Sequence, residues 1–203
     1  DKPVMTKDKG LESIFDILRR AEGLDFTYYK TATILRRISR RMVLLKLENL
    51  EAYIKFLREN KNEVEKLYED LLINVTSFFR DEKVFDTLEK SVIPAILKSK
   101  KKDESVRIWV PGCSSGEEVY SIAMLFAEAL GKKTGTVPVQ IFATDVSVVS
   151  LDKARHGIYG QGIKDNVAPA RLKRFFSKEG NNYKVSKNLR EICVFSKQNV
   201  FND

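Results

Sequence analysis

The sequence from Val110 to Met124, VPGCSSGEEVYSIAM, decides the fold of this chain. It follows an apolar strand pattern at residues 106–110, turns at glycine and continues into an apolar helical pattern at residues 119–130. A strand, a glycine-containing turn and a helix in this order are typical of a βα unit whose backbone approaches a nucleotide-like ligand. Glu117 and Glu118 open the helix, however, and two carboxylates would repel a phosphate group. The turn therefore favours a ligand that carries positive charge at this point.

A second strand pattern, at residues 137–143, continues into Thr144 and Asp145. In doubly wound folds an acid at this position accepts hydrogen bonds from ribose hydroxyls. The interval from Gly116 to Asp145 exceeds the ~20 residues of the dinucleotide fingerprint, and the turn that begins at Gly112 is not G-x-G-x-x-G, which argues against NAD. S-adenosylmethionine fits better, because it has an adenosine, no phosphate, and a positive sulfonium and α-amine. Neutralisation of the helix dipole would explain one of the two glutamates without any ligand.

The order of the other patterns predicts two domains. Apolar residues at helical spacing predict four helices, at residues 11–21, 33–46, 50–59 and 63–75. After a lysine-rich linker at residues 98–105, strand and helix patterns alternate as in a parallel sheet of the doubly wound type. We therefore expect an α/β protein with an N-terminal all-α helical domain at residues 11–75 and a partial Rossmann-like domain at residues 76–203.

The last part of the chain interrupts this alternation. Residues 169–176 have a helical pattern, and residues 182–185 and 192–195 have two strand patterns joined by a charged segment. We expect these two strands to pair as an antiparallel hairpin, within an insertion at about residues 177–196. Because the hairpin is short and charged, we expect it to be an appended docking element.

The composition excludes several classes of protein. Of the 203 residues, 43% are hydrophobic and 32% are charged, which favours a packed core over long disorder. No apolar run approaches the ~18 residues of a membrane span, and the first residues lack the apolar segment of a signal peptide. Two cysteines and one histidine, His156, argue against a disulfide framework, a metal site and a histidine-based catalytic triad. We expect a cytoplasmic protein without direct membrane insertion.

The positive charge is concentrated in one helix. The chain has a formal net charge of +8, and residues 26–47 contain no acid. Arg36, Arg37, Arg40 and Arg41 recur on one face of this helix, opposite its apolar residues. An acid-free face favours an anionic partner, so we expect these four arginines to form a partner-binding surface. Pairing of the arginines with acids on neighbouring helices is the alternative.

Five segments carry a more specific signal: FTYYKTATILRRISRRM, DLLINVTSFFRD, CSSGEEVYSIAM, IFATDVSVVSLDKARHGIY and RLKRFFSKEGNNYKVSKNLREICVFSKQNV. In order and spacing they resemble the chemotaxis-receptor methyltransferases, the CheR family, over nearly the whole chain. The last segment is similar to the family's small antiparallel β-subdomain and its return to the sheet. The proline in VPGC and the short RFFSKEGNNYKV segment are most similar to versions fused to methylesterase (CheB) and sensor domains. The resemblance implies a partial class I S-adenosylmethionine-dependent methyltransferase domain after the helical domain.

The resemblance implies a protein-glutamate O-methyltransferase of chemotaxis receptors, with S-adenosyl-L-methionine as methyl donor and S-adenosyl-L-homocysteine as product. The cofactor contacts that it implies are Asn74, Thr76 and Arg80 in an N-x-T-x-x-x-R pattern, Gly112 and Glu117 in the glycine turn, Asp145, Asn199 and Val200. Arg80 is also the catalytic candidate, because its planar guanidinium can hold a carboxylate. No general base is needed, since a glutamate with a reference pKa of about 4.3 is already ionised.

Two other functions stay open on the residues alone. One is a non-catalytic module that binds a cofactor or a partner within a fusion signalling protein. The other is a nucleic-acid methyltransferase, which the net charge suggests, although the chain lacks the aromatic-rich basic strands that stack bases, so we expect no nucleic-acid partner. Because the family continues with a fourth strand after Asp203, and Met5 is internal, we also expect both ends to be cut from a longer protein.

Overall fold

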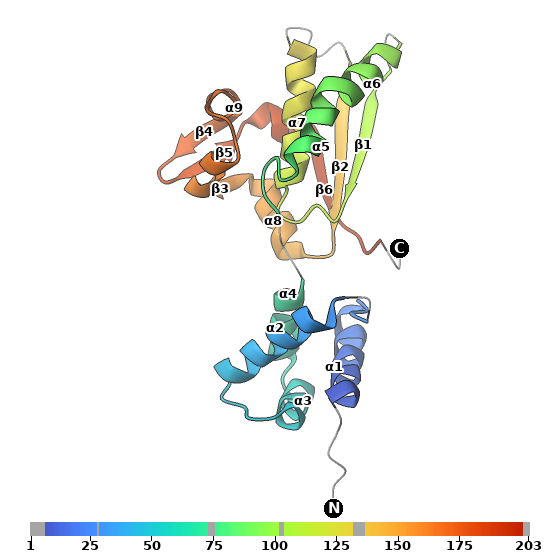
Figure 1. Cartoon of the computed structure of the whole chain (residues 1–203), viewed down its shortest axis with the longest axis vertical. Coiled ribbons are helices and arrows are strands. Elements are labelled where there is room, and N and C mark those ends of the chain that lie inside the picture. The colour runs from blue at the N-terminus through green and yellow to red at the C-terminus, as the bar shows by residue number, and fades with distance from the viewer. Residues whose placement is uncertain (1–6, 28, 73–75, 102–103, 132–136, 201–203) are drawn as a thin grey trace, which may run out of the picture. The chain divides into compact units, whose positions relative to one another are not determined.

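The structure, a computed structural model of the chain, describes residues 7–27, 29–72, 76–101, 104–131 and 137–200. It consists of two compact units, Asp1–Ile73 and Asn74–Asp203, and Figure 1 labels most of their helices and strands. None of the helices in these described ranges is long and apolar enough to span a membrane.

The described part of the N-terminal unit is helical. Its helices are α1 (Lys7–Glu22), α2 (Thr31–Leu44), α3 (Leu50–Glu59) and α4 (Lys61–Leu71). The first ends at Gly23, whose φ of 72° favours glycine. The third begins after Asn49, whose side chain accepts a hydrogen bond from the backbone N–H of Ala52 at 2.9 Å. The apolar faces meet in a core, in which Leu18, Ile34 and Leu67 are at most 1% exposed.

A buried polar network joins α2 to α4. The guanidinium of Arg41 donates to both carboxylate oxygens of Glu63, at 2.9 and 2.6 Å, and lies 3.5 Å from Asp70. The hydroxyl of Tyr53 donates to the same Glu63 at 3.0 Å. The prediction that Arg41 shares a surface with the other three arginines is therefore corrected. Its side chain is only 14% exposed and pairs with acids of another helix.

The C-terminal unit begins with a nearly continuous helical stretch. Helix α5 (Glu82–Thr87) passes through a π-helical turn (Leu88–Val92) into α6 (Ile93–Ser99). Pro94 lies in the first turn of α6, directly after the π-helical turn, and has no N–H to donate to the preceding turn of this stretch. The apolar side chains of this stretch pack against α7 and the start of the sheet, as Phe85 and Ile93 do in a cluster with Phe126.

A parallel three-stranded sheet forms the centre of the C-terminal unit. Its strands are β1 (Val106–Pro111), β2 (Val139–Asp145) and β6 (Cys193–Lys197), in the order β1-β2-β6. Helix α7 (Glu117–Leu130) connects β1 to β2, helix α8 (Val148–His156) follows β2, and both pack against this sheet (Figure 1). Parallel pairing brings the carboxyl ends of β1 and β2 to one edge, where Pro111 lies opposite Thr144.

A second, small sheet follows α8 and lies to one side of the parallel sheet (Figure 1). It contains β3 (Ile158–Gly160), β4 (Phe176–Glu179) and β5 (Asn182–Val185), all antiparallel, in the order β3-β5-β4. A 3-10 turn (Gln161–Asp165) and helix α9 (Pro169–Phe175) connect β3 to β4.

The predicted hairpin between residues 182–185 and 192–195 is wrong in its pairing. Strand β5 pairs with β4 through a tight turn at Gly180, and β6 pairs in parallel with β2 instead. The charged segment that was expected to be a turn is a short helix, α10 (Lys187–Glu191). Five helical residues return the chain to the central sheet, so the strand at 193–197 belongs to the Rossmann-like part.

Candidate active site

The candidate site lies at the carboxyl ends of β1 and β2, where residues 112–116 form the loop into α7. Hydrogen bonds attach this loop to the rest of the unit. The backbone N–H of Cys113 donates to the carbonyl of Thr144 at 3.0 Å, and the N–H of Ser114 donates to Oδ2 of Asp145 at 2.7 Å. The hydroxyl of Tyr159 donates to the carbonyl of Ser115 at 2.7 Å. The loop is therefore held from the neighbouring strand and from the small sheet.

The two glycines of the loop have different roles. Gly112 has a φ of 65° and is exposed, and no described atom lies within 4 Å of the place a Cβ would take. Gly116 has a φ of 89°, and a Cβ there would lie 2.8 Å from the Cβ of Ala154 in α8. Gly112 thus leaves the backbone open to a ligand, whereas Gly116 permits α7 and α8 to pack closely.

Asp145 is half-buried at the end of β2 and organises the backbone around it. Its Oδ2 accepts from Ser114, and its Oδ1 accepts from the N–H of Ser147 at 2.8 Å. Each carboxylate oxygen has a second lone pair. The carboxylate can therefore also accept hydrogen bonds from a pair of vicinal hydroxyls, as a ribose presents.

Glu117 opens α7 and is only 8% exposed, whereas Glu118 beside it is exposed. The hydroxyl of Ser115 lies 2.9 and 2.7 Å from the two carboxylate oxygens of Glu117, and it has one proton to donate. Among the described residues this hydroxyl is the single hydrogen-bond donor to Glu117, and a buried carboxylate with one neutral donor is incompletely solvated. The amino terminus of α7 offsets part of the cost of burying this charge. A cationic donor such as the α-amine of S-adenosylmethionine would complete the solvation of the carboxylate. The two carboxylates, Glu117 and Asp145, therefore fit this cofactor.

The segment before α5 holds the predicted Thr76 and Arg80, while Asn74 lies outside the described residues. Thr76 is half-buried and Arg80 is exposed. Phe79 has a φ of 49°, which is rare for a residue with a side chain. Its N–H donates to the hydroxyl of Ser121 in α7 at 3.1 Å, and the neighbouring Phe78 is buried. Packing of these two phenylalanines fixes the backbone from which Arg80 extends.

The predicted Asn199 and Val200 follow β6. The backbone N–H of Gln198 donates to the carbonyl of Asp145 at 3.0 Å, which brings this segment to the same edge of the sheet. Asn199 is half-buried and Val200 is 47% exposed. The structure thus gathers Gly112, Asp145 and the 198–200 segment at one edge.

Tyr159 is a site residue that the sequence analysis missed. It is 3% exposed, and burial, followed by the charge of Glu117, raises its pKa far above the ordinary value for tyrosine. The phenol therefore stays a neutral donor to the glycine loop. It comes from β3, more than 40 residues after the loop, and no local pattern could have indicated the contact.

The cysteines and the histidine do not supply a catalyst. Burial, with a smaller contribution from Asp145, raises the pKa of the Cys113 thiol to about 12, so it is protonated at neutral pH. Nδ1 of His156 lies 2.6 Å from the carbonyl oxygen of Asp152, in the last turn of α8. Neither residue is arranged as a nucleophile or a general base.

Three of the four predicted arginines of α2 take part in none of the described ion pairs. Arg36 and Arg40 are exposed, and no described ion pair involves either of them. Arg37 is half-buried, and its Nε is buried without a hydrogen-bond partner among the described residues. Arg41 points inward, as described above.

The parallel sheet, the open glycine loop, the acid at the end of β2 and the buried acid at the start of α7 define the cofactor-binding half of an S-adenosylmethionine-dependent methyltransferase. Comparison with known families specifies which kind. Residues 74–203 match the model of the CheR methyltransferase SAM-binding domain, and residues 9–72 match that of the CheR methyltransferase all-alpha domain. The chain therefore belongs to the CheR methyltransferase family.

Curated relatives agree with this family. An uncharacterised 104.1 kDa protein of Rhodobacter capsulatus is 33% identical over 96% of this chain, which spans 20% of that protein. Proteins named chemotaxis protein methyltransferase are 29% identical in Borreliella burgdorferi and 28% identical in Salmonella typhimurium, over 98% and 95% of this chain. The chain spans 72% and 66% of those two proteins.

These matches confirm the fold class, the enzyme class and the cofactor predicted from the sequence: an all-α domain followed by an S-adenosylmethionine-binding methyltransferase domain of the chemotaxis type.

Proposed function

We propose that the full-length protein methylates glutamate side chains on the cytoplasmic signalling region of a chemotaxis receptor. The observation that carries this proposal is the family match over both units, together with an acid pair, Glu117 and Asp145, that suits a cationic adenosine cofactor. The relatives named chemotaxis protein methyltransferase support the same reaction. The cytoplasm is the corresponding compartment, in which two cysteines without a disulfide would stay reduced.

We assign the cofactor contacts as follows. Asp145 accepts hydrogen bonds from the ribose hydroxyls, and Glu117 accepts from the α-amine. Gly112 lets the backbone approach, and Asn199 and Val200 flank the adenine. Asn74, Thr76 and Arg80 complete the site, with Arg80 binding a carboxylate of the cofactor or of the incoming glutamate.

The chain's residues act by positioning rather than by proton transfer. Bound S-adenosylmethionine would supply an activated methyl group for direct transfer to a carboxylate. A receptor glutamate is ionised at neutral pH, so no residue has to remove a proton. The rigid loop at residues 112–116 and the fixed backbone at Phe79 hold the reacting groups in place, which is the main source of catalysis in such a reaction.

We further propose that α2 meets the receptor through Arg36, Arg37 and Arg40. The exposed guanidiniums of Arg36 and Arg40 would attract an acid-rich helical surface and raise the association rate. Such steering is screened by salt. Arg41 is left out because its charge is already neutralised by Glu63 and Asp70.

The test is transfer of a radiolabelled methyl group from S-adenosylmethionine to a purified receptor signalling region by the full-length protein. We expect label that alkali releases as methanol, the behaviour of a glutamyl methyl ester. Arg36→Ala with Arg40→Ala should slow labelling at low salt, while Lys55→Ala with Arg58→Ala, two exposed cations on α3, serves as a control with the same loss of charge. Cofactor binding without transfer to any receptor would instead favour a non-catalytic module.

A further inference from the structure

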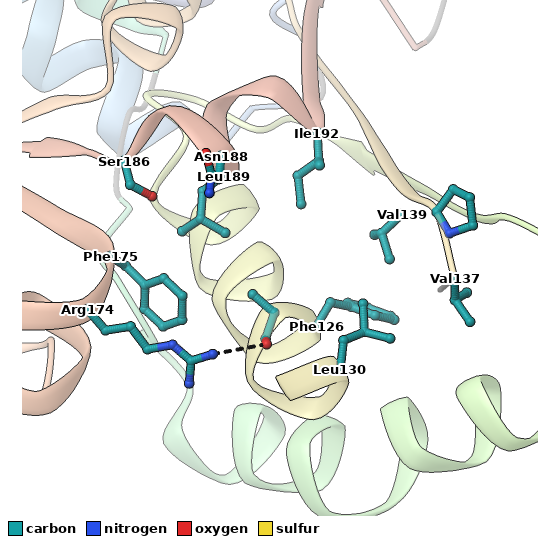
Figure 2. Close-up of a pocket in the computed structure, with 12 residues that line it drawn as sticks. Phe126, Leu130, Val137, Val139, Arg174, Phe175, Ser186, Asn188, Leu189 and Ile192 are labelled. Atoms are coloured by element: carbon teal, nitrogen blue, oxygen red, sulfur yellow. Dashed lines mark hydrogen bonds between the residues drawn. The ribbon is translucent and has the colours of Figure 1, made fainter. Parts of the chain in front are cut away.

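A cavity of about 530 Å³ lies away from the candidate active site, at the start of β2. Figure 2 shows its lining, which comes from α7, from residues 137–139, from α9 and from α10. The apolar part of the wall includes Phe126, Leu130, Val139, Phe175, Leu189 and Ile192. A volume of this size is in the range of small-molecule sites, which are mostly apolar with a few polar groups.

The cavity is distinct from the cofactor site. It lies at the first residues of β2, whereas the cofactor residues follow the end of the same strand at Asp145. The strand has seven residues, so its two ends are roughly 20 Å apart at about 3.3 Å per residue. A ligand in this cavity would therefore not reach the glycine loop.

Three polar side chains line the cavity, and in Figure 2 the ring of Phe175 lies between the guanidinium of one and the side chains of the other two. They are Arg174, Ser186 and Asn188. The guanidinium of Arg174 lies 4.8 Å from the ring centroid of Phe175, and one of its N–H groups donates to the carbonyl of Ala127 at 3.3 Å. The side chains of Ser186 and Asn188 take part in none of the described hydrogen bonds.

Arg174 is exposed at the rim of this cavity, and its charge has no acidic partner among the described ion pairs. Glu128, the acid that follows Ala127 in α7, pairs with Arg171 at 2.8 Å instead. No acid is found among the described residues that line the cavity. The apolar wall and the single cation at its side together suit an apolar molecule with one anionic end.

We propose that this cavity binds a small amphipathic carboxylate, with its apolar body against Phe126 and Leu130 and its carboxylate on Arg174. Such a ligand would contact α7 and β2 of the central sheet layer and also α9 and α10, which flank the small sheet. It would therefore hold the small sheet's connections against the central sheet layer. This site is independent of methyl transfer.

Isothermal titration of the full-length protein with decanoate tests the proposal. Decanol tests the contribution of the ligand's hydrocarbon tail alone, and acetate that of its carboxylate alone. We expect saturable binding of one decanoate, weaker binding of decanol and none of acetate. Arg174→Gln should weaken decanoate about tenfold or more, since it removes a charge-assisted hydrogen bond. Decanol should be unaffected by this change. Lys173→Gln, an exposed lysine of the same helix outside the cavity, is the matched control and should change nothing.

A second variant tests the apolar wall. Ala127→Phe adds a ring at the lining and should abolish binding of both decanoate and decanol, and circular dichroism checks that this variant is folded. Val194→Lys, on the exposed face of β6, tests adsorption elsewhere. The proposal is overturned if decanoate does not saturate, if Arg174→Gln binds it as the parent does, or if Val194→Lys is the change that removes binding.

Discussion

Replacing Glu117 with glutamine is expected to weaken cofactor binding without lowering the stability of the fold. The carboxylate is buried, and the single hydroxyl proton of Ser115 serves both of its oxygens. Glutamine keeps the size of the side chain and an oxygen that Ser115 can donate to, but it removes the charge. The two consequences, for binding and for folding, have opposite signs.

The magnitudes follow from this geometry. A charge-assisted hydrogen bond to the ligand's ammonium contributes about 1.5–3 kcal/mol, so its loss should raise the dissociation constant by roughly ten- to 150-fold. For folding, the lost interaction with the α7 dipole costs about 0.3–1 kcal/mol, whereas relief of the incompletely solvated charge returns about 1–3 kcal/mol. The second effect is larger, so the free energy of unfolding should rise by about 1 kcal/mol.

The assays are calorimetric titration with S-adenosylhomocysteine and urea unfolding of the full-length protein. S-adenosylhomocysteine keeps the α-amine but has no sulfonium, so it isolates the contact in question. Glu118→Gln, one residue away and exposed, is the control and should leave cofactor affinity unchanged. The reasoning is refuted if Glu117→Gln binds S-adenosylhomocysteine as tightly as the parent and unfolds more easily, because Glu117 would then only neutralise the helix dipole.

Three further changes have distinct expected results. Tyr159→Phe removes the hydrogen bond to the carbonyl of the glycine loop. In urea, the free energy of unfolding should fall by about 1–3 kcal/mol, and S-adenosylhomocysteine should bind more weakly. If both values are unchanged, the loop does not depend on this hydrogen bond. Gly116→Ala places a Cβ 2.8 Å from the Cβ of Ala154 at a φ of 89°. The thermal unfolding midpoint of this variant should therefore fall by several degrees. A midpoint equal to the parent's would contradict the close packing of α7 on α8. Arg41→Ala leaves Glu63 buried without its ion partner and should destabilise the N-terminal unit by about 3 kcal/mol or more. Arg36→Ala should change the free energy of unfolding very little in the same experiment. Equal effects of the two changes would contradict the buried ion pair of Arg41.

The central βα unit could be predicted from the sequence because its signals are local. The apolar strand, the glycine turn and the acid-opened helix all lie within 25 residues, and α7 and β2 form within two residues of their predicted bounds. The position of Asp145 at a strand end follows from the same pattern, and parallel pairing then brings it to the loop.

Other features depended on pairings between distant segments. Residues 192–195 were correctly predicted as a strand, but a strand pattern does not indicate which strand it pairs with. The short helix α10 brings the chain back to β2, with which this strand pairs. The helical spacing of Arg41 placed it with its neighbours, yet acids from α4 lie close enough to turn its side chain inward. In both cases the deciding contact comes from another element.

Trp109 gives the protein an intrinsic optical signal beside the candidate site. It is the single tryptophan of the chain, it is 53% exposed, and its indole N–H donates to the hydroxyl of Thr144 at 3.1 Å. Thr144 precedes Asp145, so a ligand that hydrogen-bonds to Asp145 changes the electrostatic field and the solvent exposure at the indole. Steady-state fluorescence, excited near the red edge of tryptophan absorption, should therefore report cofactor binding as a shift in emission without any label, and quenching by iodide should decrease when the edge of the sheet is occupied.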